Sequence, residues 1–137
     1  MTASPRTVLM IDDEANARKM VKLLLEREGY QVFTAANGQE GLLLAKVERP
    51  QVILLDLMMP KMTGHDTLRR LREDEDTRRI PVIIVSARSH EQDIAASFRQ
   101  GVVSYIEKPY ETQDLLQKIQ VALTLAAQGG SFPAAEA

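Results

Sequence analysis

The sequence predicts an α/β fold, a doubly wound sheet of five parallel strands with helices on both faces. Three observations predict it. Five short apolar runs recur along the 137 residues, amphipathic segments separate them, and the connections are short. Regular alternation of strand and helix with short loops is typical of right-handed crossovers in a parallel sheet.

The five apolar runs are the predicted strands. They comprise Thr7 to Ile11, Gln31 to Ala35, Gln51 to Leu55, Pro81 to Val85 and Ser104 to Ile106. The first, third and fourth are rich in Val, Ile and Leu without alternation, which is typical of strands buried on both faces. The second run alternates more, so we expect it at or near an edge of the sheet.

Two helices are predicted around the second strand. The first begins near Glu14 and stops at Gly29, because apolar residues recur at helical spacing and glycine favours a helix end. Its predicted buried stripe comprises Ala17, Met20, Val21 and Leu24. Asn37 with Glu40 three residues later resembles a capping box, which opens a second helix to about Val47.

Two further helices are predicted between the third and fifth strands. Thr63 and Gly64 precede a helix that carries Leu68 and Leu71 among arginines, and Ser89 with Gln92 is a cap signature for the next. The predicted stripe of the fourth helix comprises Ile94, Ala95 and Phe98, and the helix stops at Gly101.

The fifth helix completes one domain. Thr112 opens it, and its apolar stripe comprises Leu115, Ile119, Ala122 and Leu123. We therefore expect a single folded unit over residues 7–127. Residues 1–6 and the tail 128–137, which holds Gly-Gly, Ser and Pro, are expected to be flexible ends.

Composition excludes several classes of function. The chain has no cysteine, which rules out disulfides, thiol catalysis and cysteine-bound zinc. Seventeen basic and nineteen acidic residues give a net charge of -2, which argues against a dedicated nucleic-acid or membrane surface. No apolar stretch approaches the about 20 residues that span a bilayer, and no signal-peptide core follows the first residues. We expect a cytoplasmic protein.

Polar residues stand where four predicted strands end. Asp12 and Asp13 follow the first strand, Asp56 the third and Ser86 the fourth, and the fifth leads to Lys108. Open parallel sheets bind ligands beyond the carboxyl ends of their strands. Three carboxylates, a hydroxyl and an ammonium group are therefore expected at one edge of the sheet.

This set of groups favours one chemistry. Clustered carboxylates repel one another unless a cation neutralises them, and hard oxygen ligands suit Mg²⁺. A carboxylate can act as a nucleophile that forms an acyl phosphate, and phosphoryl transfer needs mainly positioning and charge neutralisation. Each residue alone also has an ordinary interpretation, since an Asp pair often caps a helix and a lone Lys is usually solvated. Only the joint placement at one edge favours the phosphoryl site.

The ordered set resembles a known family. The matching residues are Asp12-Asp13-Glu14, Asp56 with Met58-Met59-Pro60 and Gly64, Ser86-Ala87, and Tyr105 with Lys108-Pro109. They resemble the receiver domain of two-component response regulators, including the chemotaxis-type single-domain regulators, over about Thr7 to Leu125. The resemblance implies the (βα)5 flavodoxin-like fold with strand order 2-1-3-4-5.

The resemblance also implies the role of each residue in the site. Asp56 is implied to accept a phosphoryl group from a sensor histidine kinase or a phosphotransfer protein. The implied ligands of Mg²⁺, or of Mn²⁺ in its place, are Asp12, Asp13, Asp56 and the backbone carbonyl of Met58, with Asp12 acting through water. Ser86 and Lys108 are implied to bind the phosphoryl group.

A switch is implied at the fourth helix, fifth strand and fifth helix. Ser86 moves toward the phosphoryl group, and Tyr105 turns inward and repacks this surface for a downstream protein partner. Pro60, Gly64 and Pro109 are expected to shape the loops, with a cis bond before Pro109. We expect a monomer, or a weak dimer through the same face.

Other functions remain open at this point. An aspartyl-phosphate phosphatase also uses a strand-end Asp and Mg²⁺, but it needs a second Asp two residues later, where this chain has Met58. We therefore expect no enzyme beyond self-catalysed phosphorylation and dephosphorylation of Asp56. A receiver excised from a larger multidomain regulator or kinase, or a binding module that is never phosphorylated, are further alternatives. His65, His90 and the arginines between Arg69 and Arg79 are expected to lie on the solvated surface.

Overall fold

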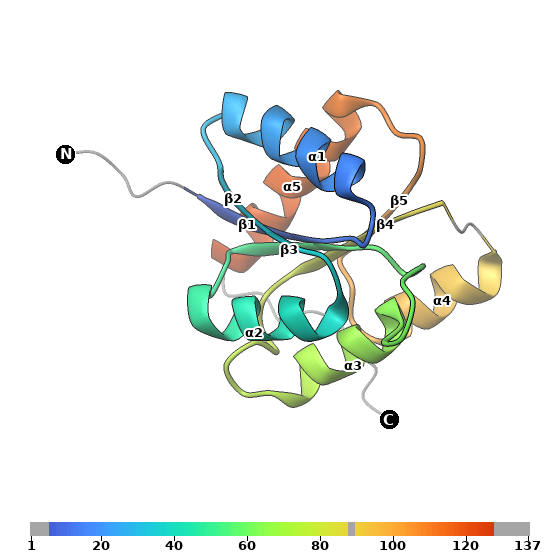
Figure 1. Cartoon of the computed structure of the whole chain (residues 1–137). Helices are drawn as coiled ribbons and strands as arrows, with labels where there is room; N and C mark the ends of the chain where they lie inside the picture. The colour runs from blue at the N-terminus through green and yellow to red at the C-terminus, as the bar shows by residue number, and fades with distance from the viewer. Residues whose placement is uncertain (1–5, 88–89, 128–137) are drawn as a thin grey trace.

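The computed structural model describes residues 6–87 and 90–127, and it contains one parallel sheet between two layers of helices (Figure 1). The strands are β1 (Thr7–Ile11), β2 (Gln31–Ala35), β3 (Val52–Leu55), β4 (Val82–Ser86) and β5 (Ser104–Glu107). The helices are α1 (Ala15–Arg27), α2 (Gly38–Glu48), α3 (Gly64–Glu73), α4 (Glu91–Arg99) and α5 (Thr112–Ala127). The strand order β2-β1-β3-β4-β5 confirms the predicted fold, and β2 is the predicted edge strand.

The boundaries of three strands differ from the prediction by one residue. Strand β3 begins at Val52, β4 runs from Val82 to Ser86, and β5 extends to Glu107. Pro81 lies just outside β4, since proline has no N–H to donate to the ladder. Ser86 is consequently the last residue of the strand and not part of the following loop.

The core consists of two layers on opposite faces of the sheet, with α1 and α5 on one face and α2, α3 and α4 on the other (Figure 1). Alternate strand residues point to opposite faces, so each buried strand supplies both layers. The first layer includes Val8, Met10, Val21, Leu25, Leu54, Ile83, Leu115 and Ile119. The second includes Leu9, Ile11, Ala45, Ile53, Leu55, Leu68, Leu71 and Ile84.

Two predicted helix stripes are partly wrong. In α1, Val21 and Leu25 are buried, whereas Met20 is 55% exposed. In α4, Ser97 is buried and Phe98 is 42% exposed. Both errors are rotations by one residue, which a short amphipathic pattern does not resolve because the i+3 and i+4 positions both lie near one face. The stripe of α5 is buried at Leu115, Ile119 and Ala122, and Leu123 packs at its margin.

Side chains cap α2 and α3, and the cap at Asn37 confirms the prediction. The Asn37 side chain accepts a hydrogen bond from the Glu40 backbone N–H at 2.8 Å, and the Thr63 hydroxyl accepts one from the Asp66 N–H at 3.1 Å. The predicted cap at Ser89 lies outside the described residues. So do the predicted flexible ends, apart from Arg6.

Arg72 and His65 are not ordinary surface residues, which corrects the prediction for both. The Arg72 Nη1 atom donates to the carbonyl oxygens of Arg78 and Ile80, and its Nη2 atom donates to that of Gly101, each at 2.9 Å. His65 is half-buried, and its Nδ1 atom lies 2.9 Å from Gln100 Oε1. These contacts join α3 to the end of α4. His90 is exposed, as expected.

Candidate functional site

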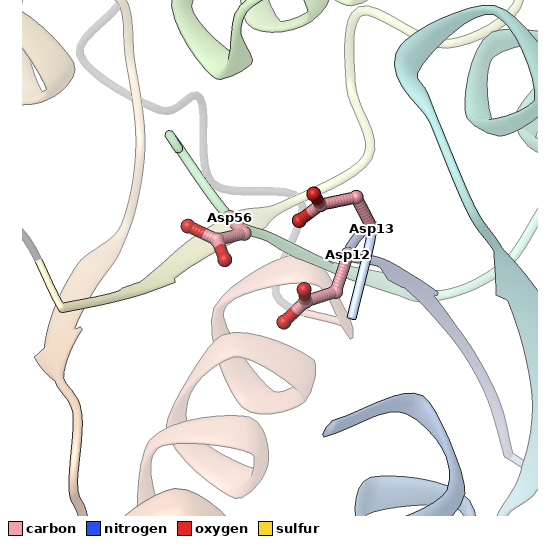
Figure 2. Close-up of side chains that lie close together, drawn as sticks. All are labelled: Asp12, Asp13 and Asp56. Atoms are coloured by element: carbon pink, nitrogen blue, oxygen red, sulfur yellow. The ribbon is translucent and has the colours of Figure 1, made fainter. Parts of the chain in front are cut away.

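Three carboxylates meet at the carboxyl edge of the sheet, where the prediction places them. Asp12 and Asp13 follow β1, and Asp56 follows the neighbouring strand β3, so adjacent strands bring the side chains together (Figure 2). One oxygen atom from each carboxylate lies within 4.8 Å of the other two. Asp12 and Asp56 are buried and Asp13 is exposed, which leaves the cluster open to solvent on one side.

The backbone fixes the two buried aspartates. The sheet ladder continues past the strand ends, since the Asp12 N–H donates to the Ala35 carbonyl at 3.1 Å and the Asp56 N–H to the Ile11 carbonyl at 3.0 Å. Each side chain then accepts a hydrogen bond from the backbone N–H two residues later, at 2.9 Å in both cases. This Asx turn holds each carboxylate in one orientation.

Lys108 bridges the two buried carboxylates. Its Nζ atom lies 2.6 Å from Asp12 Oδ2 and 3.2 Å from Asp56 Oδ2. The Lys108 backbone N–H donates to the Ser86 carbonyl at 2.8 Å, so the lysine is anchored beside the end of β4. The ammonium group therefore lies in the site, and the interpretation of Lys108 as a solvated turn residue is wrong.

Burial and neighbouring charges shift the pKa values of Asp56 and Lys108. Burial raises the pKa of Asp56 above its usual range and the Asp12 charge adds to this, although the Met58 N–H and Lys108 oppose it. Burial alone lowers the pKa of Lys108, but the hydrogen bond to Asp12 and the charge of Asp56 outweigh it, so its pKa is raised. Lys108 is consequently cationic at neutral pH.

Ser86 and Tyr105 lie where the sequence places them. Ser86 is buried at the end of β4, and its strand position pairs with Glu107 of β5. Tyr105 is half-buried on the edge strand β5, opposite Ile84, and packs against the second core layer. Ser86 therefore ends the strand that neighbours β3, which leads to Asp56, and Tyr105 lies one strand further out.

The loop after Asp56 requires glycine at position 64. A Cβ atom there would overlap the Leu57 Cα atom and lie 2.6 Å from the Asp56 carbonyl oxygen, and both are backbone atoms that cannot move aside. The Gly64 N–H also donates to the Leu57 carbonyl at 3.2 Å. Gly64 thus lets α3 begin directly against the loop that follows Asp56, in agreement with its predicted loop-shaping role. Pro60 is exposed in the same loop.

The Lys108-Pro109 bond is cis, which confirms that prediction. Pro109 lines a cavity of about 450 Å³ between α1 and the loop after β5. Tyr110 lines the same cavity, and burial raises its pKa. Tyr110 is not predicted from the sequence, because a tyrosine after a Lys-Pro pair carries no distinguishing pattern.

The donor set suits a hard divalent cation. Three carboxylates supply oxygen atoms at close range, one of them exposed, and Mg²⁺ prefers a few carboxylates together with water. Met58 follows Asp56 in the same loop and is 49% exposed. The acidic cluster can therefore hold a metal ion at the predicted residues Asp12, Asp13 and Asp56.

Arg18 also contacts the site, although the sequence does not predict it. Its Nη1 atom donates to the Asp12 backbone carbonyl at 2.8 Å. In the sequence, Arg18 is marked only by its position on the first turn of the helix that follows Asp12 and Asp13. A half-exposed arginine on an amphipathic helix gives no reason to single it out.

The fold and the site define a receiver domain. Residues 8–120 match the family model described as the response regulator receiver domain, and the chain belongs to this family. Receiver domains act in two-component signalling, where they interact with kinases and with downstream partners.

Among curated proteins, the chain is similar to PilH of Pseudomonas aeruginosa, with 38% identity over 116 residues that cover 85% of this chain and 96% of PilH. It is 34% identical over 126 residues to the phosphate regulon transcriptional regulatory protein PhoB of the same organism, covering 92% of this chain. The chain spans about half the length of PhoB and of the other transcriptional regulators it matches.

Solved structures agree with the fold. A CheY-like receiver domain protein from Methanospirillum hungatei superimposes with a TM-score of 0.87 at 30% identity, covering 93% of this chain and all of that one. The chemotaxis protein CheY4 of Vibrio cholerae superimposes with a TM-score of 0.83 at 30% identity, covering 88% of this chain and all of that one. The receiver domain of a Pseudomonas aeruginosa sensor histidine kinase was solved with magnesium in its active-site cleft. It superimposes with a TM-score of 0.81 at 25% identity, covering 88% of this chain and 99% of that one.

The hydropathy of the helices does not indicate a membrane crossing in the described residues. Among residues 6–87 and 90–127, none of the helices combines the length and the apolar character that a membrane crossing requires.

Proposed function

We propose that this receiver takes a phosphoryl group on Asp56 in a Mg²⁺-dependent reaction and passes the signal to a partner protein. One observation carries the proposal. Asp56 Oδ2 lies 3.2 Å from the Lys108 ammonium, inside a cluster of three carboxylates that can hold a metal ion. A nucleophile, a fixed cation and a divalent-metal site are the parts that phosphoryl transfer needs. The proposed location is the cytoplasm.

The donor in this proposal is a phosphohistidine of a sensor kinase or a phosphotransfer protein. A carboxylate oxygen of Asp56 attacks phosphorus, the P–N bond breaks, and its electron pair stays on the imidazole nitrogen. An acyl phosphate remains on Asp56. Bound Mg²⁺ would supply charge neutralisation, held by Asp13, Asp56 and the Met58 carbonyl, with Asp12 acting through water.

The residues around Asp56 have defined tasks in this proposal. Lys108 already lies beside Asp56 Oδ2, where it can pair with a phosphoryl oxygen after transfer. Ser86 binds the phosphoryl group through its hydroxyl. The Asx turn at Met58 keeps the attacking carboxylate in one orientation, which reduces the entropic cost of reaching the reactive geometry.

The proposed output surface is formed by α4, β5 and α5. Tyr105 lies on β5, and Phe98 of α4 and Val121 of α5 are exposed apolar residues on the flanking helices. An inward turn of Tyr105 would alter the apolar surface between these helices. A monomer, or a weak dimer through this face, would present the surface to a partner.

The test is mass spectrometry after incubation with acetyl phosphate and Mg²⁺. We expect one added phosphoryl mass on the wild-type chain, and none on Asp56→Asn or after chelation of Mg²⁺. In a matched sample, the Tyr105 resonances should shift when beryllofluoride is added. Absence of the mass gain, under conditions that label an established receiver, would refute phosphorylation of Asp56.

We also propose that the chain performs no multiple-turnover hydrolysis. The position two residues after Asp56 holds Met58, whose thioether cannot act as the general acid of an aspartyl-phosphate phosphatase. Incubation with a generic phosphomonoester should release no more than one phosphate per chain. Continuous release that disappears in Asp56→Asn would identify a phosphatase instead.

A further inference from the structure

We propose that Arg18 is a positioning residue for the metal site, which it serves by fixing the peptide plane between Asp12 and Asp13. This inference rests on the proposed Mg²⁺ site and adds to it a residue outside the acidic cluster. Arg18 lies on the first turn of α1 and is half-buried, with its Nη1 atom 2.8 Å from the Asp12 carbonyl oxygen.

Asp12 has a separate protein donor for each of its oxygen atoms. Its Oδ1 atom accepts from the Glu14 N–H at 2.9 Å, its Oδ2 atom lies 2.6 Å from Lys108 Nζ, and its carbonyl accepts from Arg18. The Asp12 N–H continues the sheet ladder to Ala35. The residue is therefore held at every polar atom, and Arg18 supplies the contact to the carbonyl.

That carbonyl determines where Asp13 points. A peptide unit is planar, so the direction of the Asp12 C=O bond fixes the direction of the bond to the Asp13 nitrogen. Asp13 is exposed and lacks the burial that constrains Asp12 and Asp56. Without the guanidinium contact the plane can rotate, and the Asp13 carboxylate would then spend less time in reach of the other two.

The charge of Arg18 and its positioning role predict opposite changes in Mg²⁺ affinity when Arg18 is removed. Arg18 adds a positive charge near three carboxylates, so removing it would strengthen the attraction of the site for a cation. Loss of positioning weakens metal binding instead, because groups that orient metal ligands typically contribute about tenfold or more to affinity. The sign of the change in affinity therefore separates the two effects.

The experiment is calorimetric titration of the metal-free chain with Mg²⁺. We expect Arg18→Met to bind Mg²⁺ about tenfold more weakly than the wild type, and Arg18→Lys, which keeps a charged donor of similar length, to recover most of the affinity. Lys19→Met is the matched control, since it removes an equal charge from an exposed neighbour on the same helix. It should bind as tightly as the wild type or more tightly.

A second readout separates positioning from a general loss of structure. With acetyl phosphate, Arg18→Met should require more Mg²⁺ but reach a rate close to the wild type at saturation. If Arg18→Met fails to fold by far-UV circular dichroism, Arg18→Gln replaces it, because its shorter side chain loses both charge and reach. Equal or tighter Mg²⁺ binding by the folded variant overturns the inference. Absence of binding by the wild type would instead refute the proposed metal site itself.

Discussion

Replacing Arg72 by methionine should destabilise the protein far more than the same change at any solvated arginine. The guanidinium donates three hydrogen bonds of 2.9 Å, two to the loop between α3 and β4 and one to Gly101 after α4. Burial lowers its pKa to about 10, which leaves it protonated at neutral pH. Methionine keeps most of the packing of the side-chain stem, so the change isolates the polar contacts.

The magnitude follows from these contacts. A hydrogen bond contributes about 0.5–1.5 kcal/mol net, and the carbonyl groups left without a donor lie partly away from water. Three bonds give an expected loss of about 2–4 kcal/mol in the free energy of unfolding. With a urea dependence of about 2 kcal/mol per molar, the midpoint should fall by about 1–2 M.

Arg69 provides the matched control on the same helix. Its side chain is 54% exposed, and its contact is an ion pair with Asp66 at 3.5 Å. Exposed pairs of this kind contribute little, so Arg69→Met should change stability by less than about 0.5 kcal/mol. Urea unfolding followed by far-UV circular dichroism measures both variants. Equal midpoints for Arg72→Met and Arg69→Met would refute the reasoning.

Two further substitutions test the site and its loop. Gly64→Ala should lower the free energy of unfolding in urea by about 1–3 kcal/mol, because the new Cβ meets backbone atoms of Leu57 and Asp56. It should also slow labelling by acetyl phosphate. Unchanged stability would contradict the overlap. Asp56→Asn should stabilise the metal-free protein at neutral pH, since the raised pKa of Asp56 means that the folded state disfavours the ionised carboxylate. The free energy of unfolding of the wild type falls as the pH rises from 3.8, the ordinary pKa of an aspartate, through the raised pKa of Asp56. Over this range the unfolded chain ionises Asp56 more readily than the folded state does. The gain in Asp56→Asn should therefore vanish at pH below that ordinary value in thermal unfolding with chelator, and a constant gain across pH would contradict it.

The fold was predictable because its signals are local. Each buried strand is a run of Val, Ile and Leu that ends at a polar residue, and the cap at Asn37 is a short pattern. The site was predictable for a related reason. Carboxyl ends of parallel strands share one edge, so residues directly after three strands must lie close together whatever the side-chain details.

The errors occurred where a residue's environment comes from a distant part of the chain. Arg72 stands among exposed arginines in sequence, but one of its acceptors, Gly101, is 29 residues away. His65 meets Gln100, which is 35 residues away, and no helical pattern indicates that contact. The rotation of α1 that buries Leu25 and exposes Met20 likewise depends on packing against the sheet.

The position of the acidic cluster has a physical consequence for cation binding. The sheet holds Asp12 and Asp56 by backbone hydrogen bonds from neighbouring strands, so neither carboxylate can retreat into solvent when its partner is charged. Lys108 relieves part of this repulsion, yet burial keeps the pKa of Asp56 raised. A group that binds here and brings positive charge lowers the free energy of the folded state, because it binds that state and not the unfolded chain. The same rigid placement that disfavours the free carboxylate therefore favours the binding of a cation at the site.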